Sequence, residues 1–174
     1  MTYFNGNNDN ECCKTDREFS ECKPQHQTAK SILLECGRGT GRRIFASSDD
    51  TPFQIARVTI DTTSLKKPNV LIKFSSSVRF EGEPDATIRL KYELFKGCGE
   101  GSPISCNLQV YEKINGDLAV NASTEDTFGF ITCDCMTSQR CCDYFITVTP
   151  IEISGASAIV FNGQITALAQ SSRN

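Results

Sequence analysis

The sequence predicts an all-β protein: an antiparallel two-sheet β-sandwich, jelly-roll-like, with about 8–10 strands and an extended N-terminal arm. Three observations predict it. Apolar and polar side chains alternate at period two along much of the chain after residue 30, which is typical of strands with one buried face. Clusters of glycine, proline and asparagine separate these stretches, as turns do. No stretch repeats its apolar residues with the 3.6-residue period of a helix.

The length of 174 residues fits one folded domain with an arm. Residues 1–30 are mostly polar and show no hydrophobic period, so we predict an extended N-terminal arm. Residues 31–174 are predicted to form the β-sandwich domain.

A glycine-rich segment lies among the first strands of the body. Gly37–Gly41 is followed by Arg42 and Arg43, which together look like a phosphate-binding loop. Such a loop must open a helix, whereas the strand-like Ile44-Phe45 follows here. The segment is therefore predicted to be a turn. The first three predicted strands span residues 32–36, 43–46 and 53–60.

Strand alternation is clearest in the middle of the chain. Residues 88–94 alternate apolar with charged side chains without a break, and residues 70–80 place one apolar set on a shared face. Gly82–Asp85 between the two stretches predicts a turn. The apolar set of the earlier stretch is Val70, Ile72, Phe74, Val78 and Phe80.

The later strands follow the same pattern. Leu108, Val110 and Ile114 are predicted to be the core-facing side of one strand. Two long runs rich in β-branched residues are split by Ser154-Gly155, which predicts a hairpin. The other predicted strands of this part span residues 127–133, 144–153 and 158–169.

Charge and composition exclude several classes of partner. Eighteen Lys and Arg residues against 21 Asp and Glu residues give a net charge of −3, without the basic excess that nucleic-acid binding requires. No apolar run approaches the roughly 20 residues of a membrane span. The first residues lack the basic and then apolar pattern of a secretory signal, so synthesis without a signal peptide is expected.

The chain has ten cysteines but a single histidine, His26, which falls in the predicted arm. One imidazole excludes single-chain metal sites that need two histidines. A cysteine nucleophile needs a positioned base, and an arm is a poor place for one. We therefore predict no catalytic residue, no cofactor and no metal ligand, and we expect that the protein is not an enzyme.

Four cysteines lie within residues 133–142. A four-thiolate zinc site is one interpretation, but the Cys-x-Cys and Cys-Cys spacings match zinc ligation poorly. A β-hairpin or loop whose two arms are stapled by a disulfide, with any leftover thiol free to pair elsewhere, is the preferred interpretation.

The arm cysteines Cys12, Cys13 and Cys22 suggest links between chains. Adjacent cysteines seldom bond to one another because the small ring is strained. An extended arm of this length spans up to about 100 Å, which is far enough to reach neighbouring domains. The alternative is that these cysteines close onto their own domain. The candidates for inter-subunit disulfides are Cys12, Cys13, Cys22 and Cys36, and the other disulfide candidates are Cys98, Cys106, Cys133, Cys135, Cys141 and Cys142.

Several segments resemble a family of small cysteine-rich proteins of unknown function from spore-forming clostridia, over roughly residues 31–172. The polar arm with a Cys-Cys pair before a sandwich is similar in architecture to the endospore appendage subunits of bacilli. Those subunits self-assemble into fibres by sheet augmentation, with arm cysteines bonded to subunits further along. The resemblance implies that Cys12 and Cys13 are the interchain donors. The segments that carry the family resemblance are residues 32–41, 51–63, 70–76, 144–150 and 167–172.

The expected function is therefore a structural subunit of an extracellular, disulfide-cross-linked filament on the spore surface. Its partners are other copies of itself in a helical homopolymer, and other spore-surface proteins. Such a protein is made in the mother-cell cytoplasm without a signal peptide and exposed when that cell lyses, which reconciles the cysteines with the missing signal.

Two alternatives from other classes stay open. The first is a monomeric sandwich with internal disulfides that binds carbohydrate or a coat protein. The second is a zinc protein built on the cysteines of residues 133–142.

Overall fold

The computed structural model describes residues 32–45, 51–99, 102–114, 122–135 and 141–171, without the side chains of Phe45, Ala122 and Cys135. These residues form strands joined by turns, and no helix among them is long and apolar enough to cross a membrane. The predicted arm lies outside the described residues. The strands are β1 (Ile32–Arg38), β2 (Arg42–Phe45), β3 (Phe53–Asp61), β4 (Pro68–Cys98), β5 (Ile104–Ile114), β6 (Ala122–Cys135) and β7 (Cys141–Ser171).

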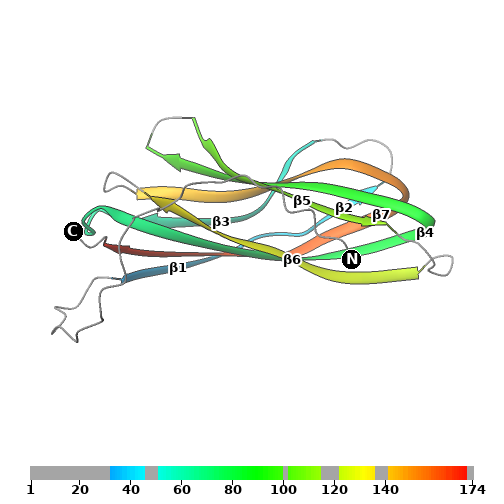
Figure 1. Cartoon of the computed structure of the whole chain (residues 1–174), viewed down its shortest axis with the longest axis horizontal. Coiled ribbons are helices and arrows are strands. Elements are labelled where there is room, and N and C mark those ends of the chain that lie inside the picture. The colour runs from blue at the N-terminus through cyan, green and yellow to red at the C-terminus, as the bar shows by residue number, and fades with distance from the viewer. Residues whose placement is uncertain (1–31, 46–50, 100–101, 115–121, 136–140, 172–174) are drawn as a thin grey trace, which may run out of the picture.

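The two longest strands, β4 and β7, hold the fold together. Each has 31 residues, and they pair antiparallel along nearly their whole length (Figure 1). The ribbon bends where Gly82 pairs with Ala156 and Thr87 pairs with Ser154. The residues of β4 between these pairs bulge out opposite the single residue Gly155, which adopts a positive φ of 62°. Each strand thereby contributes one half to each of two sheets.

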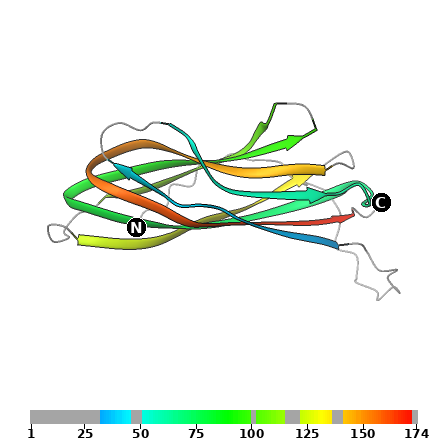
Figure 2. The same ribbon diagram turned by 180° about the vertical axis from the view of Figure 1, so that it is seen from behind.

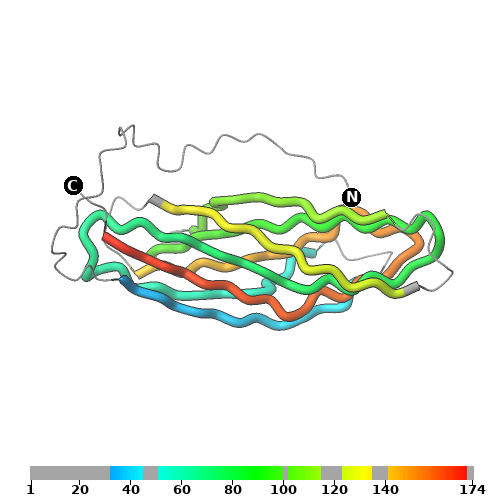
Figure 3. Tube along the Cα trace, turned by 60° about the horizontal axis from the view of Figure 1, so that its bottom comes forward, coloured from blue at the N-terminus to red at the C-terminus, as the bar shows by residue number. Residues whose placement is uncertain are grey.

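One sheet, sheet A, contains β1 with β2, the second half of β7, the first half of β4, and β6 (Figure 3). The other, sheet B, contains β3, the first half of β7, the second half of β4, and β5 (Figure 2). The described residues thus form an antiparallel two-sheet β-sandwich of the jelly-roll type, which confirms the predicted fold class.

The core lies between the two sheets and contains the predicted face of β4. Val70, Ile72, Phe74, Val78 and Phe80 are at most 1% exposed. The opposite face of the same stretch, including Lys73 and Arg79, is exposed. Alternation therefore identified both the strand and its buried side here.

Two predicted turns are bends within continuous strands instead. Ser154-Gly155 is no hairpin, because β7 continues through it into sheet A and does not pair with itself. Gly82–Asp85 likewise lies inside β4. Both segments have the residues of a turn, and they use them to carry a paired ribbon around the corner of the sandwich.

The face predicted for β5 is wrong. Leu108, Val110 and Ile114 are 50%, 43% and 61% exposed, while Tyr111 on the opposite face is 9% exposed. β5 pairs only with β4 among the described strands, so it is an edge strand. At this position a tyrosine ring, rather than the apolar set, enters the space between the sheets.

Backbone contact closes one lateral side of the sandwich. A side chain added at Gly39 would place its Cβ 1.3 Å from the carbonyl oxygen of Ile55 in β3. The glycine-rich segment predicted to be a simple turn thus lets the junction of β1 and β2 press against β3. On the opposite side, β5 and β6 are joined through side chains only, since no backbone pairing links them.

Candidate functional site

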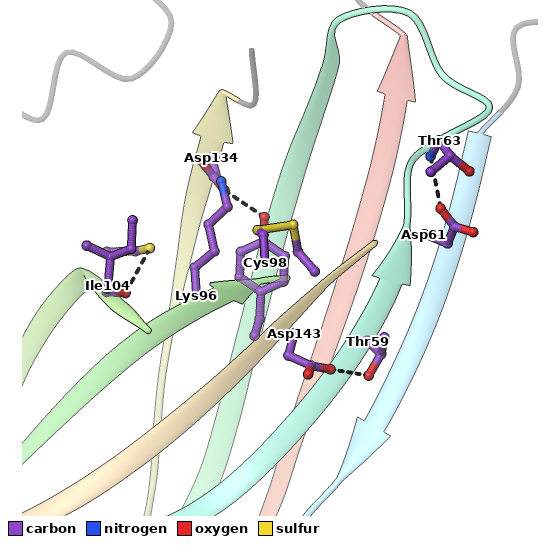
Figure 4. The surroundings of a disulfide bond; sticks show 11 residues. Thr59, Asp61, Thr63, Lys96, Cys98, Ile104, Asp134 and Asp143 are labelled. Carbon is purple, nitrogen blue, oxygen red and sulfur yellow. Dashed lines mark hydrogen bonds and ion pairs between the residues drawn. A yellow bond between two sulfur atoms is a disulfide. The ribbon is translucent and has the colours of Figure 1, made fainter. Parts of the chain in front are cut away.

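Cys98 and Cys142 form a disulfide within the sandwich (Figure 4). They are directly opposite one another on β4 and β7, and their Cα atoms are 4.4 Å apart. Cys142 is 1% exposed, so the bond lies in the core of one end of the molecule. Cys142 therefore pairs outside residues 133–142, as the staple interpretation allowed for a leftover thiol, and a zinc site that uses this thiolate conflicts with the bond.

Three cysteines of the described residues have exposed side chains: Cys36, Cys133 and Cys141. Cys36 is on β1 in register with Thr166, and its sulfur lies 4.0 Å from the Thr166 hydroxyl. The side chain points out of sheet A, since its neighbour Gly37 packs towards β3. Cys141 precedes the buried Cys142 on β7, so its side chain points out of sheet B. The thiols of Cys36 and Cys141 thus lie on opposite outer faces of the sandwich.

A shallow cavity of about 250 Å³ lies beside Cys141. Gly97 and Gly99 leave room there, because no atom of the protein lies within 3.8 Å of a Cβ added at Gly97. Arg57 and Asp143 form an ion pair along its wall, and Thr59 donates a hydrogen bond to the same carboxylate (Figure 4). The hydrogen bond from Arg57 holds the pKa of Asp143 below its usual value.

The remaining cysteines are in different environments. Cys106 is the extra residue at a register shift of β5 and donates a hydrogen bond to the carbonyl oxygen of Ile104, 3.6 Å away (Figure 4). Cys133 is exposed on β6. Cys12, Cys13 and Cys22 lie outside the described residues, as does the side chain of Cys135. The structure therefore brings together only Cys98 and Cys142 of the described cysteines.

An apolar patch on the outer face of sheet A borders Cys36. Strand register places Leu34, Leu168, Leu71 and Cys133 in one row across four strands. The next row contains Cys36 and Ile131, on the two outer strands. We call this surface the outer patch. Its apolar members are Ile32, Leu34, Leu71, Ile131 and Leu168, of which Ile32, Leu34 and Ile131 are 59–63% exposed.

Two tyrosine–aspartate–lysine clusters tie β6 to sheet B. Asp126 accepts hydrogen bonds from Tyr111, at 2.8 Å, and Lys113, at 2.7 Å. Burial tends to raise the pKa of Asp126, but the hydrogen bonds from Lys113 and Tyr111 outweigh it and hold that pKa below its usual value. Burial and the bonded carboxylate raise the pKa of Tyr111.

The second cluster lies at the end of the sandwich that contains the disulfide (Figure 4). Asp134 accepts hydrogen bonds from Tyr144 and Lys96, each at 2.6 Å. Burial, followed by the hydrogen bond to Asp134, raises the pKa of Tyr144. Both clusters cross between the sheets, so their geometry indicates a structural role. Among the described residues, no three His, Cys, Asp or Glu side chains are grouped so that they could hold a metal.

Pattern analysis identified the apolar stripe on β5 but assigned it to the core. Leu108, Val110 and Ile114 share the outer face of sheet B, and Ile104 at the start of the strand is 68% exposed. The opposite face of the strand carries Tyr111 together with the polar residues Asn107, Gln109 and Lys113. The one available signal was this tyrosine among polar residues, because a ring can fill space that shorter polar side chains cannot.

Comparison with known structures finds jelly-roll proteins of low identity. Eiger TNF from S. frugiperda is 8% identical with a TM-score of 0.41, over 82% of this chain and 96% of that one. The infectious bursal disease virus Gx strain structure is 9% identical with a TM-score of 0.36, over 89% of this chain and 40% of that one. These likenesses concern the fold alone. No curated protein matches the sequence.

One family matches most of the chain. Residues 30–170 match the domain of unknown function DUF4489. The protein therefore belongs to the DUF4489 family.

Proposed function

We propose that this DUF4489 protein is a structural subunit that self-assembles into an extracellular, disulfide-cross-linked filament on the spore surface. Edge strands of neighbouring copies pair by β-sheet augmentation, and cysteines of the N-terminal arm form disulfides with other copies. The spore-surface location rests on the resemblance to clostridial cysteine-rich proteins and to endospore appendage subunits.

The observation that carries the proposal is the apolar outer stripe of the edge strand β5. Of the eight large apolar side chains that are exposed among the described residues, four belong to this strand. Soluble proteins usually protect an edge strand with charges, proline or bulges, because its free backbone groups pair readily with another strand. β5 has one such bulge, at Cys106, but its outer face adds apolar surface to the edge, which favours pairing with another copy.

The exposed thiol of Cys36 supports the covalent part of the proposal. It lies on a solvent-facing surface of an edge strand, where a cysteine from another chain can reach it. Thirty-one residues precede β1, and they include Cys12, Cys13 and Cys22. If extended, they span about 100 Å, which exceeds what is needed to reach a neighbouring copy.

Contact between unlike surfaces gives a filament rather than a closed dimer. An arm that binds a body is a heterologous contact, which generates an open helical polymer unless its rotation closes a ring. Each disulfide then prevents a copy from dissociating when denaturant disrupts the noncovalent contacts.

The test is a denaturing gel of the full-length protein, boiled with and without reductant after free thiols have been blocked. We expect a ladder, or material retained in the well, that collapses to the 19.2 kDa monomer only with reductant. Electron microscopy of the same sample should show filaments.

A monomer band in both lanes, with a monodisperse monomer by light scattering at high concentration, would contradict the proposal. That result would favour a monomeric binding module with internal disulfides.

A further inference from the structure

The outer patch of sheet A is an apolar surface that the described residues leave uncovered. It extends across β1, β7 and β4, because Leu34, Leu168 and Leu71 are successive partners in register, and Cys133 on β6 completes the row. Ile32 and Ile131 extend it along the two edge strands. Soluble monomers rarely keep a contiguous apolar surface of this kind without a binding partner.

We propose that the outer patch is the docking surface for the N-terminal arm, residues 1–31, of a second copy. This inference rests on the proposed function and names the surface that receives the arm. The arm supplies suitable side chains, since it contains Tyr3, Phe4 and Phe19 among polar residues. Aromatic side chains bury a large apolar area when they bind such a surface.

The position of Ile32 at one end of the outer patch favours docking of the arm on a second copy rather than on its own chain. Ile32 is the first residue of β1 and pairs with Gln170, so the arm joins the sheet at the end of the outer patch that contains Ile32. To cover its own patch, the chain would have to reverse sharply just before Ile32. Among residues 25–31, Ser31 alone belongs to the residue types that favour such a reversal, and none is the glycine, proline, asparagine or aspartate of a tight turn. The patch of the next copy along the filament requires no reversal.

Cys36 makes the docking irreversible. Its thiol lies within the outer patch, one row from Leu34 and Leu168. When the arm is docked, the Cys36 thiol and the thiol of Cys12 or Cys13 each lose a proton and together lose two electrons, and an S–S bond forms. A small-molecule disulfide such as oxidised glutathione accepts the electrons and is reduced to two thiols.

The experiment uses full-length protein in natural-abundance and ¹⁵N-labelled forms. The two forms are reduced, mixed in equal amounts and oxidised with glutathione disulfide, and disulfide-linked peptides are identified by mass spectrometry over time. Three proteins are compared: wild type, Leu34→Thr/Leu71→Thr, and the control Ile151→Thr. Ile151 is 47% exposed and lies outside the outer patch.

We expect peptides that join Cys36 to Cys12 or Cys13 and contain one labelled and one unlabelled partner. Leu34→Thr/Leu71→Thr should form them about tenfold more slowly, which corresponds to ~1.4 kcal/mol. Ile151→Thr should form them at the wild-type rate. Threonine keeps the β-propensity of each position, and circular dichroism verifies that the fold is retained.

Two results would overturn the inference. One is a set of Cys36 links in which both partners always carry the same label, because the arm would then bind its own body. The other is an unchanged rate for Leu34→Thr/Leu71→Thr, because the patch would then contribute nothing to docking.

The remaining outcomes separate this inference from the proposed function. A reductant-sensitive polymer whose links omit Cys36 would overturn the docking surface and leave the filament proposal intact. The absence of any interchain link would overturn both.

Discussion

Asp126 is one of two aspartates on β6 whose carboxylates connect the two sheets. Its carboxylate on β6 accepts hydrogen bonds from Tyr111 and Lys113 on β5. Its pKa lies below the usual value in the folded protein. The carboxylate therefore stabilises the fold above its ordinary pKa near ~3.9, and this contribution is lost as the pH falls through the lower folded pKa.

Asp126→Asn should lower the free energy of unfolding at pH 7 by about 1–2 kcal/mol, because a charged acceptor is replaced by a neutral one. The loss of stability between pH 5 and pH 2 should also be shallower than in wild type, although Asp61 and Asp143 with their lowered pKa values still contribute. Urea unfolding across this pH range measures both effects. Glu125→Gln, one position away in an exposed ion pair, should change the stability by less than ~0.5 kcal/mol. Equal acid sensitivity of Asp126→Asn and wild type would count against this account.

The Cys98–Cys142 disulfide should contribute about 4 kcal/mol to stability, because it restricts a long loop of the unfolded chain. Cys98→Ala/Cys142→Ala should therefore unfold at much lower urea than wild type, whereas Cys36→Ala, which removes an exposed thiol, should not. Reductant should bring wild type close to the double variant. Persistence of the full difference in reductant would show that packing, and not the bond, is responsible.

At the residue scale, the sequence identified which cysteines are present but not how they pair. Ten cysteines allow many connectivities. Cys98 and Cys142 are opposite only because β4 and β7 pair in one particular register over the full ribbon, which is a property of long-range contacts. Neither spacing nor local pattern carries that information, so the sequence listed Cys98 and Cys142 as disulfide candidates without pairing them.

At the scale of elements, strands were easier to predict than their orientation. Period-two alternation depends on neighbouring residues, so it identified β4 and its buried side. On the edge strand β5 both faces are partly exposed, and the apolar phase points outward. Alternation cannot tell which face of β5 is buried, because the ring of Tyr111 fills the core from the face that otherwise carries polar residues. The bends in β4 and β7 were predicted as turns because the residues that bend a ribbon are those that reverse a chain.

The exposed apolar side chains of β5 should contribute to assembly and not to the stability of the monomer. Leu108→Thr/Val110→Thr should change the free energy of unfolding of the reduced monomer, measured in urea, by less than ~0.5 kcal/mol, since both side chains are exposed. The same variant should polymerise more slowly by light scattering. Tyr111→Ala is the matched opposite, because it removes a buried ring and should cost about 3 kcal/mol. Destabilisation of the monomer by the threonine variant would contradict the observed orientation of β5.

The close packing of the β1–β2 junction on β3 gives a second prediction at this scale. Gly39→Ala places a Cβ 1.3 Å from the Ile55 carbonyl oxygen, so the junction must move away from β3. We expect a loss of about 1–3 kcal/mol, as for other overpacked sites. Gly97→Ala is the control, because its Cβ meets only Pro103 at 3.8 Å. Thermal unfolding compares the two, and equal stability would show that the junction adapts without cost.

At the scale of the whole molecule, the sandwich presents two different outer faces. Sheet A carries the outer patch with Cys36, and sheet B carries the β5 stripe and Cys141. The fold class could be predicted because a jelly roll is specified by repeated strands and turns. The composition of the two outer faces could not be predicted, because it depends on which strands become neighbours in each sheet. Faces of different character suit a polymer in which each copy contacts unlike surfaces.

Cys12→Ser/Cys13→Ser tests how such a polymer is held together. The body contains neither residue, so the fold and the unfolding free energy should match wild type. Filaments should still form through noncovalent edge pairing, but they should dissolve in urea without reductant, whereas wild-type filaments should need both. Sedimentation of filaments in urea, with and without reductant, measures the difference. Cys22→Ser is the matched control within the arm, since Cys22 lacks an adjacent cysteine. If the double variant forms filaments as resistant as wild type, other cysteines make the covalent links, and the arm contributes only its noncovalent contacts.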